Sequence, residues 1–347
     1  MAEAGKGSKK EFPNGQLVLV TGGGGFLGQV VVTQLLKAGY RVRSFSRSDH
    51  PPIRKLGAET VLGDLADPKA VLKACKGCDI VFHTAAKADI WGKYQDFYST
   101  NVTGTENIIA ACKKNKVGRL VFTSSASVVF DAGDIEGGDE KLPYPETPRS
   151  NYCSTKAEAE RLVLKANSKA LRTVSLRPHL IWGPGDTQII PRIIERARSG
   201  RLVIIGDGKN KVDITYIDNA ARAHLNAAKA LVENPKCSGR AYFISNGEPV
   251  NVWDFINRIL KMSGIPQLKK SLPRGPAMFI AFINEIPYVV LPLKGQPRLN
   301  RFLVEELTTS HWFDISAAKK ELGYEPTVTI EEGLTRLKAS FKKGGKK

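Results

Sequence analysis

"QLVLVTGGGGFLG", residues 16–28, joins an apolar run to a glycine-rich turn and then to the start of a helical pattern. By their spacing, Gly22, Gly25 and Gly28 are the glycines that matter. The first permits a tight turn, the second lets the backbone approach a pyrophosphate, and the third lets helix and strand pack closely. The phosphate would lie at the helix N-terminus, where free N–H groups and the helix dipole favour negative charge. The stretch therefore predicts a dinucleotide-binding site after the first strand of a sheet.

The rest of the first 180 residues repeats this alternation of short apolar runs and helical patterns. We expect strands at 16–22, 41–47, 59–65, 79–86, 119–126 and 172–178, and helices beginning near Gly28, Pro68, Asn101 and Tyr152. Such alternation predicts βαβ units and a parallel sheet covered by helices on both faces. The expected fold class is α/β, a Rossmann-type doubly wound parallel sheet with a smaller, mostly helical C-terminal substrate domain.

The rhythm of the pattern changes after Pro178, and this change sets the expected domain limits. We predict a dinucleotide-binding domain at 15–182, with return segments at about 212–246. The substrate-binding part is expected at 183–211 and 247–341. Lysine-rich segments at 1–14 and 342–347 are expected to be disordered basic tails, because they lack the apolar residues needed for a core.

The composition limits the partners and the compartment. The 347 residues carry a net charge of +18, with 42% hydrophobic and 25% charged residues, as in an ordinary globular protein. The basic residues are scattered and form no aromatic-interleaved stripe, so we expect no nucleic-acid partner. An anionic substrate and cofactor account for part of the excess. The five cysteines, an odd number without framework spacing, favour a reducing compartment, and we predict a cytoplasmic protein.

No metal site and no membrane-spanning segment are expected. The five histidines have no ligand spacing, and Cys75 and Cys78 form a lone CxxC without a second pair. The most apolar segment, 276–295, is interrupted by Asn284, Glu285, Pro287 and Pro292, and no uninterrupted apolar run reaches the length of about 18 residues that a spanning helix needs. We expect this segment to belong to the core or to a substrate pocket. A shallow contact with a membrane surface is the alternative.

The end of the second predicted strand indicates which nicotinamide cofactor is bound. An acidic side chain is expected there if the cofactor has a free ribose diol. The sequence instead reads "FSRS", with Ser46 in the acidic position and Arg47 after it. A guanidinium can make charge-assisted hydrogen bonds to a 2′-phosphate, which a carboxylate would repel. NADP(H) is therefore the predicted cofactor, with NAD(H) as the alternative.

"YCSTK", 152–156, places a tyrosine and a lysine one helical turn apart, and Ser124 and Ser125 end the strand before it. Beside a nicotinamide, a tyrosine hydroxyl can exchange the proton that accompanies hydride transfer. Its solution pKa of about 10 is high for work at neutral pH, and a nearby ammonium would lower it. We therefore predict Tyr152 as the acid–base residue, Lys156 as the cation beside it and Ser125 as a hydrogen-bond partner of the substrate oxygen. A non-catalytic dinucleotide-binding protein would be expected to lack part of this set.

These motifs resemble the extended short-chain dehydrogenase/reductase superfamily over nearly the whole chain. "TGGGGFLG" (21–28), Ser125 and "YCSTK" match its TGxxGFxG, strand-end serine and YxxxK, and "GDLAD" (63–67), "HTAAKA" (83–88) and "NVTGTENII" (101–109) match further motifs. The resemblance implies that Asn101 supports the proton relay. It also implies a homodimer and cofactor contacts, beyond the glycines, Arg47 and Lys156, from Phe26, Leu27, Asp64, Leu65, Ala85, Ala86 and Pro178.

"LRPHLIWGPGD" (176–186) and "VDITYIDNAARAH" (212–224) look like the 3β-hydroxysteroid dehydrogenase branch. Within it, the chain is most similar to the bacterial 2-alkyl-3-oxoalkanoate reductases of olefin biosynthesis, which implies NADPH-dependent reduction of a lipid-like 3-oxo acid and association with other enzymes of that pathway. The alternatives are a decarboxylating sterol-4α-carboxylate 3-dehydrogenase and a 3β-hydroxysteroid dehydrogenase. Arg47 favours the reductive direction, because cells keep the NADP(H) pool reduced.

The residues that bind the substrate are harder to predict. A fatty or steroidal substrate needs an apolar tunnel, for which 276–293 and three tryptophans, Trp91, Trp182 and Trp253, are candidates. The substrate carboxylate needs a cation, and Lys87 and Arg192 are expected on loops near the strand ends. His179 follows the sixth strand, where it borders the nicotinamide or packs in the core.

Overall fold

The computed structural model describes residues 15–291, 293 and 295–344. Seven parallel strands form its main sheet, in the order β12-β7-β5-β4-β1-β2-β3. Their bounds are β1 Leu17–Thr21, β2 Arg41–Ser46, β3 Glu59–Leu62, β4 Ile80–His83, β5 Arg119–Thr123, β7 Arg172–Pro178 and β12 Arg240–Ile244. The predicted Rossmann-type fold is confirmed. The strand order reverses between β1 and β4, and in such sheets the ligand binds at the reversal, beyond the carboxyl ends of the strands.

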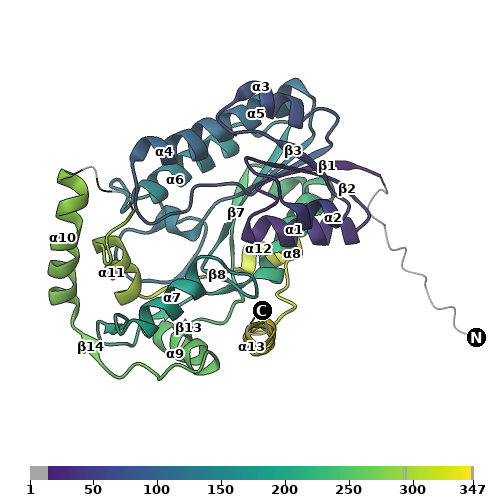
Figure 1. Cartoon of the computed structure of the whole chain (residues 1–347). Helices are drawn as coiled ribbons and strands as arrows, with labels where there is room; N and C mark the ends of the chain where they lie inside the picture. The colour runs from purple at the N-terminus through teal and green to yellow at the C-terminus, as the bar shows by residue number, and fades with distance from the viewer. Residues whose placement is uncertain (1–14, 292, 294, 345–347) are drawn as a thin grey trace, which may run out of the picture.

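Helices cover both faces of this sheet (Figure 1). Helices α1 and α8 pack against each other on one face, with α12 against α8, and α3, α5 and α6 lie on the other. Alternate residues of β1 show why: Val18 and Val20 belong to the core under α1 and α8, and Leu19 belongs to the core under α3 and α5. The helices of this part are α1 Phe26–Lys37, α2 Pro51–Lys55, α3 Pro68–Ala74, α4 Tyr94–Tyr98, α5 Gly104–Lys114, α6 Asn151–Lys165, α8 Ile217–Glu233 and α12 Ser316–Leu322.

A third hydrophobic core holds the smaller part of the molecule together. Its helices are α7 Ile189–Arg198, α9 Val252–Met262, α10 Arg274–Val290, α11 Arg301–Thr308 and α13 Ile330–Gly344. Helix α13 continues three residues into the segment that was predicted as a basic tail from 342. The other predicted tail, 1–14, lies outside the described residues.

Short strands add structure that the sequence pattern did not predict. A four-stranded sheet has the order β13-β10-β15-β6, with β13 Val250–Asn251, β10 Lys211–Val212, β15 His311–Phe313 and β6 Ile135–Gly138. Two further pairs join β8 Ile181–Trp182 to β11 Thr215–Tyr216, and β9 Ile204–Ile205 to β14 Ser271–Leu272. Single turns of other helix types are η1 Ser99–Thr103, η2 Ala126–Val129 and η3 Pro235–Cys237. Strands of two to four residues are too short to show a period of two in the sequence.

The prediction that the apolar segment 276–295 belongs to the core or to a substrate pocket was wrong for most of the segment, although Ala277 and Ala281 do lie in the core. The segment forms most of α10, which stands at the outer edge of the molecule beside α11 (Figure 1). Only Ala277, Ala281 and Glu285 of this helix are buried, and none of the described residues of 276–293 lines the large cavity described below. Apolar composition was taken as a sign of burial, but the neighbouring structure covers one face of the helix only. Within the part of the chain that the structure describes, no helix is long and apolar enough to span a bilayer.

Candidate active site

The glycine turn connects β1 to α1 and has the geometry that a bound pyrophosphate requires. Gly22 has a positive φ of 67°, and its amide donates a hydrogen bond to the carbonyl oxygen of Phe45 at 2.8 Å. A Cβ at Gly28 would lie 2.1 Å from the Gly22 carbonyl oxygen, so only glycine fits there. Gly25 precedes α1, and no side chain caps the helix. The first amides of α1 are therefore available to an anion.

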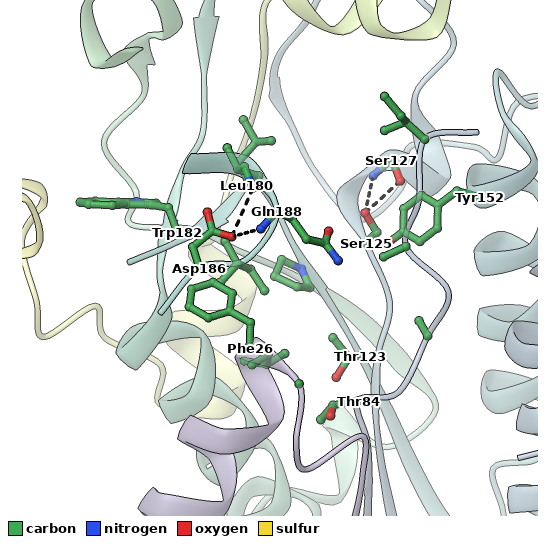
Figure 2. A pocket seen from close by; sticks show the side chains of 18 of the residues that line it. Phe26, Thr84, Thr123, Ser125, Ser127, Tyr152, Leu180, Trp182, Asp186 and Gln188 are labelled. Carbon is green, nitrogen blue, oxygen red and sulfur yellow. Dashed lines mark hydrogen bonds between the residues drawn. The ribbon is translucent and has the colours of Figure 1, made fainter. Parts of the chain in front are cut away.

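A cavity of about 800 Å³ runs from this turn to the ends of β5 and β7. It is lined by all twelve residues predicted to bind the cofactor: Gly22, Gly25, Phe26, Leu27, Gly28, Arg47, Asp64, Leu65, Ala85, Ala86, Lys156 and Pro178. Figure 2 shows Phe26 on one side of this space and Ser125 with Tyr152 on the other. The topology thus brings the two halves of the predicted site to the same edge of the sheet.

Arg47 and Asp64 lie at the end of the cavity next to β2 and β3. Arg47 is exposed, and no ion pair or hydrogen bond of its side chain occurs among the described residues. Ser46, the last residue of β2, stands where an acidic side chain would hold a ribose diol, and its hydroxyl donates to the carbonyl oxygen of Ser48 at 2.8 Å. The Asp64 carboxylate accepts the amide of Ala66 at 2.9 Å and fixes the turn after β3.

Ser125 and Tyr152 meet at the opposite end. The amide of Ser127 donates to Ser125 Oγ at 3.2 Å, and the two serine hydroxyl oxygens lie 2.9 Å apart, which orients the Ser125 side chain (Figure 2). Burial raises the pKa of Tyr152 to about 12, while its hydrogen bond with Ser125 acts in the opposite direction. The arrangement pairs a phenol with a hydroxyl that can share one substrate oxygen.

Lys156 follows Tyr152 by one turn of α6 and is buried. Its Nζ donates to the carbonyl oxygen of Thr123 at 2.6 Å and lies 4.1 Å from the ring centre of Phe122. Burial lowers the pKa of Lys156 to about 7, and the nearby carboxylate of Glu160 acts against that shift. The groups that shift the pKa of Tyr152 here do not include Lys156, so the expected lowering of the tyrosine pKa by this lysine stays a prediction.

Glu160 follows Lys156 by one turn of α6 and is the centre of a buried polar cluster. Its carboxylate accepts from Arg177 Nε at 3.0 Å, from Ser175 Oγ at 2.7 Å and from Tyr144 Oη at 2.7 Å. Burial alone would raise the pKa of Glu160, but the charge and hydrogen bonds of Arg177 outweigh burial, and the pKa is lowered. Glu160 therefore stays ionised one helical turn from Lys156, and the cluster anchors α6 to β7.

Asn101 does not line the cavity. It lies in the π-helical turn η1, where Oδ1 accepts the amide of Lys87 at 2.8 Å and Nδ2 donates to the carbonyl oxygen of Lys87 at 3.1 Å and to Thr155 Oγ1 at 3.0 Å. Single π-helical turns often occur at functional sites. Here Asn101 ties the loop after β4 to α6, while its part in a proton relay stays a prediction.

The comparison with protein families covers most of the chain, including the turn and the strand-end hydroxyl. Residues 19–274 match the model of the 3-beta hydroxysteroid dehydrogenase/isomerase family. The chain belongs to this family. A relative named 2-alkyl-3-oxoalkanoate reductase, from Stenotrophomonas maltophilia, is 50% identical over 93% of this chain and 98% of its own length. A mouse protein named sterol-4-alpha-carboxylate 3-dehydrogenase, decarboxylating, is 38% identical over 93% of this chain and 90% of its own length.

A solved structure of the same architecture comes from a more distant relative. MoeE5, in complex with UDP-glucose and NAD, is 25% identical, with a TM-score of 0.72, and the match covers 94% of this chain and 99% of that one. The likeness extends over nearly the whole of both chains.

The residues predicted to bind substrate lie in different places. Lys87 pairs with Asp89 at 3.1 Å, and Trp91 packs edge-on against Tyr288; neither lines the cavity. Arg192, on α7, does line it and lies 3.7 Å from the carboxylate of Asp89. Among the candidates for a cation that meets the substrate, the structure brings only Arg192 to the cavity.

Arg196 also lines the cavity, one turn after Arg192, and was missed. Burial, and then the like charge of Arg192, lower the pKa of Arg196. Asp186 fixes the start of this helix by accepting the amide of Gln188 at 2.7 Å (Figure 2) and the amide of Ile190 at 2.8 Å. The spacing of two arginines four residues apart in "PRIIERARSG" could have indicated a shared face.

Trp182 and Trp253 touch the cavity wall but are almost fully buried, at 1% and 2% exposure. Trp182 packs edge-on against Tyr216 and Phe255, and Figure 2 shows its ring extending away from the cavity. Both tryptophans stabilise the smaller part of the fold, and the apolar wall of the cavity comes instead from Ile189, Ile193, Leu202, Val252, Phe255 and Ile256.

Sequence reasoning also missed a histidine pair in the cavity wall. His179 Nε2 and His311 Nδ1 lie 2.6 Å apart, and His311 Nε2 lies 2.9 Å from the carbonyl oxygen of Glu306. A carbonyl only accepts, so His311 donates from Nε2 and its Nδ1 accepts from His179. Burial, followed by the effect of His311, lowers the pKa of His179 well below its usual range, which keeps His179 neutral. The two residues are 132 positions apart, and no local pattern joins them.

Proposed function

We propose that the chain is an NADP(H)-dependent oxidoreductase that reduces the 3-oxo group of a long-chain 2-alkyl-3-oxoalkanoic acid to the 3-hydroxy acid. The observation that carries the proposal is one continuous cavity with the glycine turn at one end and the Ser125–Tyr152 pair at the other. The relative from Stenotrophomonas maltophilia, named 2-alkyl-3-oxoalkanoate reductase, supports the choice of substrate class.

The residues present fit a dinucleotide. The close approach of Gly28 to Gly22 and the uncapped start of α1 leave backbone amides that can donate hydrogen bonds to a pyrophosphate. The structure of MoeE5 was solved with NAD, which supports a nicotinamide cofactor for this chain as well. When bound, this cofactor supplies the hydride for reduction.

Tyr152 and Ser125 handle the other half of the reaction. The 3-oxo oxygen would accept hydrogen bonds from both hydroxyl groups, which fixes the carbonyl. As a hydride adds to C3, the phenol of Tyr152 gives its proton to this oxygen, and the product is the neutral 3-hydroxyl group. Because burial raises the pKa of Tyr152 to about 12, the phenol carries its proton at neutral pH and is ready to act as the acid.

Lys156 and the buried cluster behind it support this step. An ammonium near the phenol stabilises the phenolate that remains after proton transfer. Lys156 reaches the strand end through its bond to the Thr123 carbonyl oxygen, which also lines the cavity. Glu160 favours the charged form of the lysine in this buried place. Lys156 is also our candidate for binding the cofactor ribose.

The substrate carboxylate would lie at Arg192 and Arg196. These two guanidinium groups share one face of α7, and an anion between them would relieve their mutual repulsion. The apolar side chains of α7 and α9 that line the same cavity would contact the alkyl chains. A sterol 4-carboxylate has the same core of carboxylate, substituted α-carbon and β-oxygen, and the 38% identity to the mouse dehydrogenase makes oxidation of such a sterol the second candidate.

Turnover assays separate these functions. With NADPH, the purified protein should reduce a long-chain 2-alkyl-3-oxo acid, and with NADP⁺ or NAD⁺ it should not turn over a sterol 4-carboxylate at a comparable rate. The methyl ester of the oxo acid should show a KM about 10- to 100-fold higher than the free acid, since it lacks a charge-assisted contact. In the double variant Arg192→Leu/Arg196→Leu, the free acid and its methyl ester should have similar KM values. Turnover of the sterol alone would overturn the proposed function.

Replacing Arg47 with aspartate tests the cofactor preference. We expect KM for NADPH to rise about 10-fold or more, because the charge-assisted bonds to the 2′-phosphate are lost and a carboxylate repels it. KM for NADH should stay the same or fall. The exposed Arg54, which pairs with Asp49 at 3.1 Å, provides the control. Arg54→Asp should leave the ratio of the KM for NADPH to the KM for NADH unchanged. An unchanged preference in Arg47→Asp would contradict the assignment.

A further inference from the structure

Helix α10 exposes a continuous apolar face. Seven of its residues on the outward side are exposed and apolar, and two of them are more than 70% exposed: Phe279, Ile280, Phe282, Ile283, Ile286, Val289 and Val290. Leu291 and Leu293 extend the exposed apolar surface beyond the helix end. No charged residue lies between Gly275 and Asn284 or between Ile286 and Leu293. Soluble proteins rarely expose a contiguous apolar surface of this kind without a use for it.

The opposite face of the helix is the one that joins it to the protein. Ala277, Ala281 and Glu285 are buried and follow one another at intervals of four residues. The carboxylate of Glu285 accepts the amide of Arg301 at 2.7 Å and its Nε at 2.8 Å, which ties α10 to the start of α11. Figure 1 shows α10 at the edge of the molecule with α11 on its inner side. The two faces are therefore clearly separated, as in a helix that lies along a surface.

The surroundings of the apolar face are strongly basic. Residues 263–304 contain six lysines and arginines and one acidic residue, the buried Glu285. Lys269, Lys270, Arg274, Arg298 and Arg301 are exposed on the segments before and after the helix. An apolar helix face with basic residues around it matches the surface of a bilayer that contains anionic lipids.

We propose that α10 binds to the surface of an anionic phospholipid bilayer, with its seven apolar side chains among the acyl chains and the neighbouring cations at the headgroups. A second copy of the chain fits this surface less well. A two-fold interface through α10 would bring the two basic surroundings together, and like charges facing each other oppose association. The proposal does not depend on the reaction proposed above.

Sedimentation with lipid vesicles tests this binding. The full chain should pellet with vesicles of phosphatidylglycerol and phosphatidylcholine, bind vesicles of phosphatidylcholine alone more weakly, and lose binding as salt is added. Phe282→Glu/Val289→Glu should reduce the partition coefficient at least tenfold, because two charges would enter the apolar layer. Lys269→Glu/Lys270→Glu should reduce binding only to the anionic vesicles.

A matched control lies on another helix. Val232, on α8, is 56% exposed, and Val232→Glu should bind vesicles as the unchanged chain does. Thermal melts of each variant establish that it is folded. No pelleting of the unchanged chain with anionic vesicles would overturn the proposal. So would a Phe282→Glu/Val289→Glu variant that binds normally, or one whose only change is a smaller oligomer by analytical ultracentrifugation, since that result assigns the face to a second copy.

Discussion

Tyr152→Phe should lower kcat by about 10³-fold, because general acid catalysis by a positioned side chain contributes about 10²- to 10⁴-fold. The substitution removes only the hydroxyl group, so the aromatic ring still fills its place beside Ser125. The Kd for NADPH, measured by fluorescence titration, should change less than about threefold, since the hydroxyl acts on the substrate oxygen.

Tyr94→Phe is the matched control for this experiment. Tyr94 is 44% exposed on α4 and does not line the cavity, so the loss of its hydroxyl should leave kcat unchanged. A Tyr152→Phe enzyme that retains kcat within tenfold of the unchanged enzyme would remove Tyr152 from the mechanism. The reaction would then need another proton donor in the cavity wall.

Arg177→Met should destabilise the fold by about 3–5 kcal/mol, the usual cost of leaving one partner of a buried ion pair without the other. Arg177 and Glu160 have side-chain exposures of 3% and 0%, and Arg177 donates from both Nε and a terminal nitrogen. Methionine fills a similar volume but supplies no donor, so the carboxylate keeps only its hydroxyl partners. The free energy of unfolding is measured by urea titration at pH 7.5.

The pH dependence of this loss gives a second readout. The lowered pKa of Glu160 means that its contribution is present above the pKa of an unfolded glutamate and is lost as the pH falls through the lowered value. In Arg177→Met the carboxyl can bind a proton more easily, so the difference from the unchanged protein should shrink toward pH 4.

The control for the ion pair is on the surface. Arg258 and Glu331 also form an ion pair, at 2.5 Å, but with side-chain exposures of 44% and 75%. Arg258→Met should cost less than about 1 kcal/mol, because water screens such a pair. Equal effects of the two substitutions would show that burial of the Glu160 cluster contributes nothing.

The sequence predicted the main sheet because its signals are local. Each strand of the large sheet is a segment of four to seven residues whose apolar side chains lie close together in the sequence, and the glycine turn is fixed by sterics within seven positions, Gly22 to Gly28. Eleven of the twelve predicted cofactor residues line one cavity because they lie at or just after strand ends of that sheet, and Lys156 reaches the same cavity from α6.

The features that were missed depend on contacts between distant segments. The four-stranded sheet joins β6, at 135–138, to β15, at 311–313. The position of β15 also brings His311 next to His179. Helix α10 was mispredicted for a different reason. The sequence shows how many apolar residues the helix has, but not which of them the protein covers. That depends on the contact with α11, which Glu285 makes through the amide of Arg301.

Helix α6 carries the proposed proton donor Tyr152, the buried Lys156 and the buried Glu160 at intervals of four residues. Each step of four residues returns nearly to the same side, since a helix advances about 100° per residue. Inserting or deleting one residue inside this span would turn everything beyond it by about that angle, and Glu160 would leave Arg177 while Tyr152 stayed in place. We therefore expect homologous chains to differ in loop length around the cavity but to keep the length of this nine-residue span unchanged.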